Sequence, residues 1–163
     1  MRRLTLEPLR PMQHHRQFAT FLLHNLFFGM DVLKVQEVIR YQEMTRVPVA
    51  PPMVEGLINL RGQIITAIDL RRRLELPERP VDQLPLNLVV RTDDGAISLL
   101  VDEIGDVVEI ESQSFERVPE TVTGIARELI LGVYKLETRL LLILDTERSA
   151  NLPASFKALS KPQ

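Results

Sequence analysis

The sequence contains no cysteine and no tryptophan, and aromatic residues make up only 5% of its 163 positions. The lack of cysteine excludes disulfides, thiol nucleophiles and thiolate metal sites, and it fits a reducing compartment. Few aromatic rings also disfavour a small-barrel binder of single-stranded nucleic acid, because such proteins stack bases on aromatic side chains. We therefore expect a cytoplasmic protein that does not bind nucleic acid.

The sequence also lacks a strong charge of either sign and a long apolar run. Its 20 basic and 22 acidic residues leave a formal net charge of −2, which is no electrostatic footprint for nucleic acid or an anionic membrane. No apolar stretch approaches the roughly 20 residues of a membrane helix. Residues 1–17 are basic and polar, without the apolar segment of a signal peptide. We expect neither membrane insertion nor export.

No residues have the spacing of a catalytic, nucleotide-binding or metal site. The adjacent His14 and His15 lack a downstream acidic residue at ligand spacing. The carboxylate pairs Asp93-Asp94 and Asp102-Glu103 are explained by turn chemistry and by strand neighbours that point to opposite faces, so a small hydrolase ranks last. The run 71–73 of three arginines is expected to lie on a solvated helix. The sequence thus predicts no catalytic residue, no metal, no cofactor and no enzymatic activity.

The composition is that of a folded domain, with 45% apolar and 26% charged residues. These proportions are ordinary for a globular protein, and the length suits one compact unit. We expect a flexible leader over residues 1–16, a domain over residues 17–150 and a C-terminal tail over residues 151–163.

Short strands dominate the pattern within that domain. The strongest signal is Asp94-Gly95, flanked by apolar runs at 86–91 and 96–101, which predicts a tight hairpin. Two further hairpins are expected, one pairing 18–23 with 28–32 and the other pairing 130–136 with 139–144. Residues 32–39 fit either a helical turn or an extended run. Eight to ten short strands with one or two short helices indicate an all-β barrel or sandwich.

Four stretches resemble the CheW family, and they occur in family order. They are FATFLLHNLFFGMDVLKVQEV (18–38), RVPVAPPMVEGLINLRGQIITAIDLRRRL (46–74), LLVDEIGDVVEI (99–110) and ILGVYKLETRLLLILDTERS (130–149). The most specific part is the pattern VPxxPxxxxGLxNLRGxIxxxxDLRxRL. The resemblance implies two SH3-like five-stranded β-barrel lobes around a shared hydrophobic core, with one or two short helices and no enzymatic activity.

The resemblance also implies a role and two partners. Members of this family are scaffolds that couple chemoreceptors, the methyl-accepting chemotaxis proteins, to the histidine kinase CheA. A groove between the lobes would take the receptor's cytoplasmic tip, and exposed strand ends would bind the regulatory domain of CheA. Carried over by position, the groove residues are Val32, Val35, Glu37, Arg61 and Leu88. The same adaptor could serve flagella, or a pathway for pili, biofilm or second messengers, and the sequence does not separate these outputs.

Four residues of the specific pattern, Gly56, Asn59, Gly62 and Asp69, are interpreted as structural. Gly56 and Gly62 bracket a short strand-like run where a positive φ or a close backbone approach needs glycine, and we expect them to turn the chain between the lobes. Asp69 precedes a short helix and is expected to cap its free amides.

Two other features suggest contacts with partners. Arg61 follows an apolar run and carries a planar guanidinium suited to a carboxylate, so either an exposed contact or a buried bridge to Glu37 would suit it. Leu26 and Phe27 stand where relatives have a polar turn, and we expect an exposed apolar pair that marks an additional interface.

Overall fold

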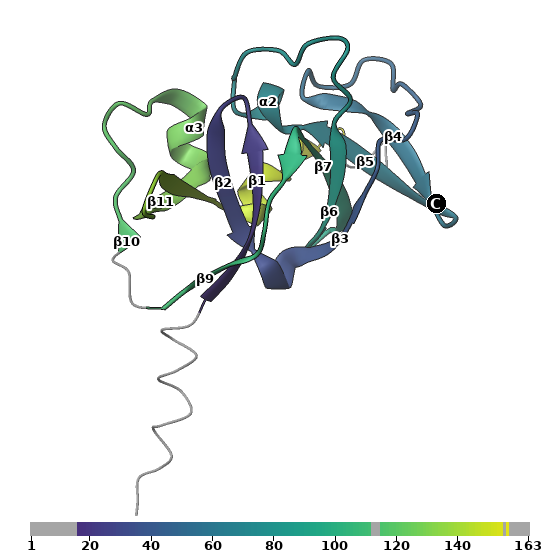
Figure 1. Ribbon diagram of the computed structural model, residues 1–163. Helices are drawn as coiled ribbons and strands as arrows, with labels where there is room; N and C mark the ends of the chain where they lie inside the picture. Colours follow the sequence, from purple (N-terminus) through teal and green to yellow (C-terminus); the bar gives the residue numbers. More distant parts are fainter. Residues whose placement is uncertain (1–15, 112–114, 155, 157–163) are drawn as a thin grey trace, which may run out of the picture.

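The computed structural model describes residues 16–111, 115–154 and 156, and the histidines at 14 and 15 lie outside this part. Its strands form two sheets (Figure 1). The seven-stranded sheet, which we call the first lobe, has the order β10 (Phe115–Glu116), β11 (Ile130–Lys135), β12 (Leu140–Leu144), β2 (Leu26–Asp31), β1 (Arg16–Leu23) and β8 (Glu103–Ile104), with β9 (Val108–Ile110) also paired to β1. The five-stranded sheet, the second lobe, has the order β3 (Val35–Ile39), β6 (Leu86–Thr92), β7 (Gly95–Val101), β5 (Gln63–Asp69) and β4 (Val54–Leu60).

Helices are few and short in the described residues. They are the 3-10 turn η2 (Val32–Lys34) and the α-helices α2 (Leu70–Arg73), α3 (Gly124–Leu129) and α4 (Thr146–Ser149). The all-β class and the two lobes are therefore confirmed. The sequence predicted fewer strands than the twelve observed, because β8 and β10 are only two residues long and carry no readable alternation.

The two lobes share one hydrophobic core because their strands bury side chains on both faces. In β12, Leu141 and Ile143 pack inside the first lobe, while Leu142 and Leu144 pack toward the second. Residues from both sheets meet in this shared core, among them Phe21, Phe28 and Met30 of the first lobe and Ile68, Leu88 and Leu99 of the second. Continuous apolar runs such as that of β12 are typical of strands covered on both sides.

The C-terminal residues also pack in this core. Leu152 and Phe156, which lie in the predicted tail, are each 5% exposed and contact the shared core.

The predicted hairpins are all present. β1 pairs with β2 across His24-Asn25, and β11 pairs with β12. The β6–β7 hairpin turns one residue earlier than expected, at Asp93-Asp94, with Thr92 opposite Gly95. Gly95 has a φ of 115° and directly follows the two turn residues. The positive φ therefore comes after Asp93-Asp94, whereas a type I′ turn would need positive φ angles within the turn.

Gly56 and Gly62 do not join the lobes, contrary to expectation, because both belong to the β4–β5 hairpin of the second lobe. β4 and β5 form a hairpin within the second lobe, and its turn residues Arg61 and Gly62 have φ values of 51° and 87°. Two positive φ angles are the mark of a type I′ turn. Asn59 supports it, because its side-chain oxygen accepts a hydrogen bond of 2.8 Å from the Gly62 N–H.

Gly56 has a different role, in closing the second lobe. Thr45 and Leu57 form an isolated bridge that joins the chain after β3 to β4, at opposite ends of the sheet order. A Cβ atom at Gly56 would lie 2.7 Å from the Thr45 carbonyl oxygen. The glycine is therefore needed for a close backbone approach, as the sequence predicted, but within one lobe.

A buried ionic cluster lies where the chain passes from the second lobe to the first. Arg71 donates from Nε to both carboxylate oxygens of Asp102 at 3.1 Å, and Arg79 donates to the same group at 2.9 Å. The His24 N–H, in the first lobe, donates to Asp102 at 2.7 Å. Asp69 caps α2 by accepting from the Arg71 N–H, as predicted, and also pairs with Arg79. The cluster thus connects α2, the following loop and both lobes.

The prediction for Arg71 was wrong. Arg71 is 5% exposed, so it does not lie on a solvated helix, and its partner Asp102 is 7% exposed. Each has a buried partner of opposite charge, and the Arg71 guanidinium also donates to the carbonyl oxygens of Pro77 and Glu78. A charge is buried only when it is paired in this way.

We expect Gly56→Ala to lower the free energy of unfolding by about 1–3 kcal/mol, since the added methyl group would press on the Thr45 carbonyl. Urea denaturation measures the change. Gly62→Asn is the matched control, because nothing lies within 4 Å of a Cβ there and asparagine tolerates a positive φ. Equal stability of Gly56→Ala and the parent protein would contradict the close approach.

We expect Asp102→Asn to destabilise the fold by about 3–5 kcal/mol, because it leaves the buried Arg71 without a counter-charge. Asp82→Asn, at an exposed position, should change stability by less than about 0.5 kcal/mol. Urea midpoints for both variants give the comparison, and similar midpoints would show that the cluster contributes little.

The same cluster predicts a pH dependence. Burial by itself raises the pKa of Asp102, but hydrogen bonds from Arg71, the His24 N–H and Arg79 outweigh it and hold that pKa below its ordinary value. The resulting stability is complete above the unfolded-state pKa of about 3.9 and is lost as pH falls through the lower folded-state value. The stability difference between the parent protein and Asp102→Asn should therefore be largest at neutral pH and shrink below about pH 4. A constant difference across this range would contradict the assignment.

Candidate functional site

An exposed ion pair between Glu37 and Arg61 is the centre of the candidate site. Glu37 lies in β3 and Arg61 in the β4–β5 turn. The curled second lobe brings these two elements together, and Arg61 Nη2 donates to Glu37 Oε2. The Arg61 side chain is 67% exposed and that of Glu37 is 26% exposed. Arg61 therefore does bridge to Glu37, but it does so at the surface.

The geometry of the turn explains why the arginine is presented to solvent. Its left-handed φ places the residue at the tip of a two-residue turn, where the side chain has no strand face to cover. The hydrogen bond from Arg61 lowers the pKa of the Glu37 carboxyl, and the positive charge adds to this effect. Glu37 is consequently ionised at neutral pH, and the pair offers both charges to a partner.

The apolar residues predicted for the site differ in their accessibility. Val32 in η2 and Val35 in β3 are half-buried, and Val35 packs against the shared core. The prediction of Leu88 as a contact residue was wrong, because Leu88 is 1% exposed and belongs to the shared core. It lies in β6, an inner strand paired on both edges, and a partner could not reach it without opening the fold.

Two exposed apolar residues near the site were missed by the sequence reasoning. Leu33 in η2 is 78% exposed, and Val38 in β3 is 44% exposed. Burial in β3 alternates, with Gln36 and Val38 on the outer face. The available signal was the two-residue alternation of β3. It places Val38 on the same face as the polar Gln36, and so on the outer face.

The expected exposure of Leu26 and Phe27 holds for Leu26 and was wrong for Phe27, while the interface itself stays a prediction. Leu26 is 37% exposed, whereas Phe27 is 8% exposed and packs in the core of the first lobe. The guanidinium of Arg139 stacks on the Phe27 ring at 3.7 Å from its centre. The two residues are neighbours in a strand and so face opposite ways, which a turn assignment could not show.

A cavity of about 600 Å³ adjoins the Arg61 turn, and we call it the hairpin cavity. It is bordered by the ends of the β4–β5 and β6–β7 hairpins and by the segment at α4 that leads to Leu152. The lining residues are Gly62, Gln63, Ile64, Thr66, Thr92, Asp94, Gly95, Ala96, Ile97, Glu147, Ala150, Asn151 and Leu152. The five residues predicted for a groove do not line it, and Gly62 is its connection to them.

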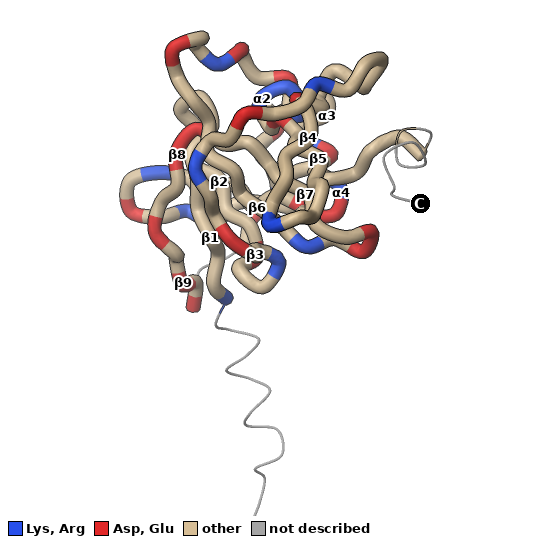
Figure 2. The backbone as a smooth tube through the Cα atoms, turned by 90° about the vertical axis from the view of Figure 1, so that its right-hand side faces the viewer, with Lys and Arg blue, Asp and Glu red and all other residues tan. Residues whose placement is uncertain are grey.

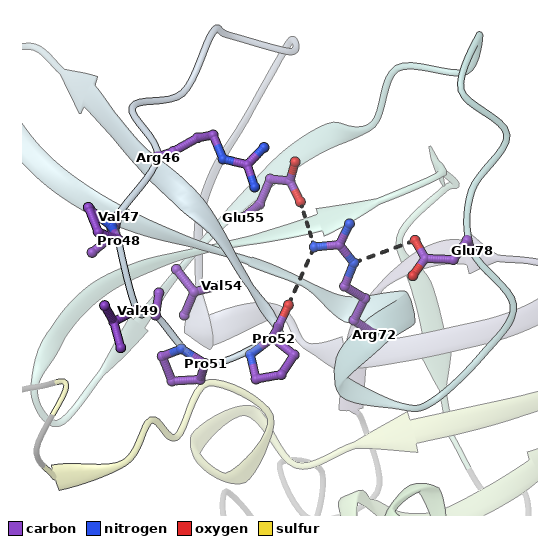
Figure 3. Close-up of a pocket in the computed structure, with 11 residues that line it drawn as sticks. Arg46, Val47, Pro48, Val49, Pro51, Pro52, Val54, Glu55, Arg72 and Glu78 are labelled. Carbon is purple, nitrogen blue, oxygen red and sulfur yellow. Dashed lines mark hydrogen bonds and ion pairs between the residues drawn. The ribbon is translucent and has the colours of Figure 1, made fainter.

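A second cavity, of about 570 Å³, lies under the proline-rich loop 46–52 (Figure 3). On one side is Val49, fully exposed and with a φ of 60°. On the other side, Arg72 donates to Glu55 at 3.0 Å and lies 3.5 Å from Glu78. A β-branched residue with a left-handed φ is unusual. The neighbouring prolines have a fixed φ, so the backbone around Val49 has little freedom to relieve this conformation.

The described residues show no cluster of three or more potential metal ligands. Among the same residues, no helix is long and apolar enough to cross a membrane. Charges of both signs are spread over the coloured part of the backbone, and neither sign gathers on one side of it (Figure 2).

Comparison with known proteins gives a consistent result. The family model described as "CheW-like domain" matches residues 17–153. The chain is 30% identical to the chemotaxis protein CheW of Treponema pallidum, over 85% of this chain and 90% of that protein. It is 32% identical to the CheW of Bacillus subtilis, over 88% and 92% of the two chains. The crystal structure of the scaffolding protein TtCheW from Thermoanaerobacter tengcongensis superposes with a TM-score of 0.73, at 29% identity, over 82% of this chain and 91% of that one.

These matches span nearly all of the described fold, and the structural neighbour agrees with the two-lobed β fold. The chain belongs to the CheW-like domain family.

Proposed function

We propose that this protein is a non-enzymatic coupling adaptor of a bacterial chemosensory system, which joins the cytoplasmic tip of a chemoreceptor to the histidine kinase CheA. The family match over residues 17–153 carries this proposal. It is supported by relatives named as chemotaxis proteins and by a structural neighbour described as a scaffolding protein. Such an adaptor works by linkage, because a partner's conformation can bias another only through a contact that both share.

The proposed receptor contact is the surface around Glu37 and Arg61. A helical hairpin tip would place apolar side chains against exposed or half-buried residues of η2 and β3, namely Val32, Leu33 and Val35. The adjacent ion pair would fix its orientation and exclude partners with the wrong charge pattern. Exposed strand ends would hold the regulatory domain of CheA. The adaptor would then be cytoplasmic and would reach membrane-associated arrays through its partners.

The charge reversals Glu37→Arg and Arg61→Glu should each weaken binding of a purified chemoreceptor hairpin fragment by about tenfold or more, since each turns an attractive contact into a repulsive one. Isothermal titration calorimetry measures the affinity. The double variant restores the pair within the chain but reverses both charges toward the partner. It should remain weak if the receptor contacts these groups directly.

A matched pair in the first lobe provides the control. Lys135 and Glu116 lie 3.6 Å apart, with side chains 68% and 42% exposed. Their reversal should leave receptor affinity unchanged. Full affinity of both single reversals at Glu37 and Arg61, in variants that remain folded by circular dichroism, would overturn the assigned surface.

A further inference from the structure

The 3-10 turn η2 carries two of the residues in the proposed receptor contact, Val32 and Leu33. None of the three residues of the turn is buried, and the Leu33 side chain is 78% exposed. A cavity of about 170 Å³ is lined by Lys34 of this turn and by Thr146 and Glu147 of α4, so the space between the turn and the helix is not filled. Hydrophobic packing of η2 therefore contributes little to its orientation, which depends on polar contacts.

Two charged side chains from other elements supply such contacts. Asp31 caps the turn locally, by accepting from the Leu33 N–H at 3.0 Å. Arg91, in β6, donates from Nη1 to the Leu33 carbonyl oxygen at 3.2 Å. Glu147, in α4, pairs with Lys34, and 3.7 Å separates Oε2 from Nζ. One contact thus reaches η2 from the second lobe and the other from the helix that follows β12 of the first lobe, and we call Arg91 and Glu147 the η2 clamp.

Glu147 is itself held by neighbouring elements. Its two carboxylate oxygens accept from the Asp93 N–H, in the β6–β7 turn, at 3.2 and 3.3 Å. The end of α4 is fixed as well, because Arg73 donates to the carbonyl oxygens of Arg148 at 2.9 Å and of Ser149 at 3.3 Å. Arg73 belongs to α2, the helix that is anchored in the buried ionic cluster. The clamp is therefore connected to the rigid junction of the two lobes.

We propose that Arg91 and Glu147 are positioning residues for the receptor contact, which hold η2 in the orientation that presents Leu33 and do not touch the receptor themselves. This inference rests on the proposed function, because it concerns the same receptor surface. The opposite charges of the two residues separate positioning from direct contact. If each met a charged group of the receptor, removing the cation and removing the anion would change the affinity in opposite directions. If both hold η2, removing either charge weakens binding.

Hydrogen exchange in the protein alone tests whether the clamp holds the turn. The Val35 N–H donates to the Val32 carbonyl and closes η2, so its exchange rate reports the opening of the turn. Arg91→Gln and Glu147→Gln should each raise this rate by about threefold, the effect of losing one exposed polar contact. The amide of Leu99, in the shared core, should keep its rate.

Calorimetry with the chemoreceptor hairpin fragment tests the effect on binding. Arg91→Gln and Glu147→Gln should each weaken binding by about two- to fivefold. Arg91→Lys keeps the charge and a donor, and it should restore most of the affinity that Arg91→Gln loses. Arg127→Gln is the matched control, because Arg127 also donates to two carbonyl oxygens, those of Pro119 and Val122, but does so at α3. Its receptor affinity should equal that of the parent protein.

The other outcomes contradict the inference in different ways. Unchanged exchange of the Val35 amide in both variants would show that the clamp does not hold η2. Opposite changes in affinity would show that the two residues contact the receptor directly. Faster exchange with full affinity would show that binding does not depend on the orientation of η2. If the parent protein itself failed to bind the fragment, the proposed function would be overturned, and the exchange rates would still decide whether the clamp holds the turn.

Discussion

Because the strands at the junction bury side chains on both faces, neither lobe can turn away from the other without exposing Phe21, Phe28 and Leu99 to water. Each large apolar side chain of this kind contributes about 1.5–3 kcal/mol when buried. The buried cluster around Asp102 adds a directional constraint at the same junction, since one carboxylate accepts from Arg71 and Arg79 and from a backbone amide of the other lobe. The surface that carries Glu37 and Arg61 is thereby held in a fixed relation to the first lobe.

The class of fold and the main hairpins could be predicted because they depend on local signals. The two apolar runs of each hairpin and the turn residues between them lie close together in sequence. The order of the matching segments came from the resemblance to the family. The NLRG segment shows the limit of such signals. Gly62 in this segment and the nearby Gly56 indicate special backbone positions. A type I′ turn and a close approach to Thr45 cannot be told from a connection between lobes without knowing which strands pair.

Burial of individual residues was the least predictable property. Leu88 and Phe27 were expected to meet a partner, and both are covered by strands distant in sequence. Arg71 was expected on a solvated helix, and it is paired with Asp102, 31 positions further along the chain. A single charged residue gives no local sign of such a partner. For Arg61, the sequence left open an exposed contact or a buried bridge to Glu37, and the structure has the bridge at the surface.

The order of strands has a consequence for the assembly of the chain. The second lobe uses β3 to β7, which are consecutive, whereas the first lobe combines β1 and β2 with strands that come after β7. During synthesis from the ribosome, β2 must therefore wait for β12, its parallel neighbour, until the second lobe has already emerged. The N-terminal hairpin exposes an unpaired edge throughout that delay, so the middle of the chain provides the first surface on which it can settle.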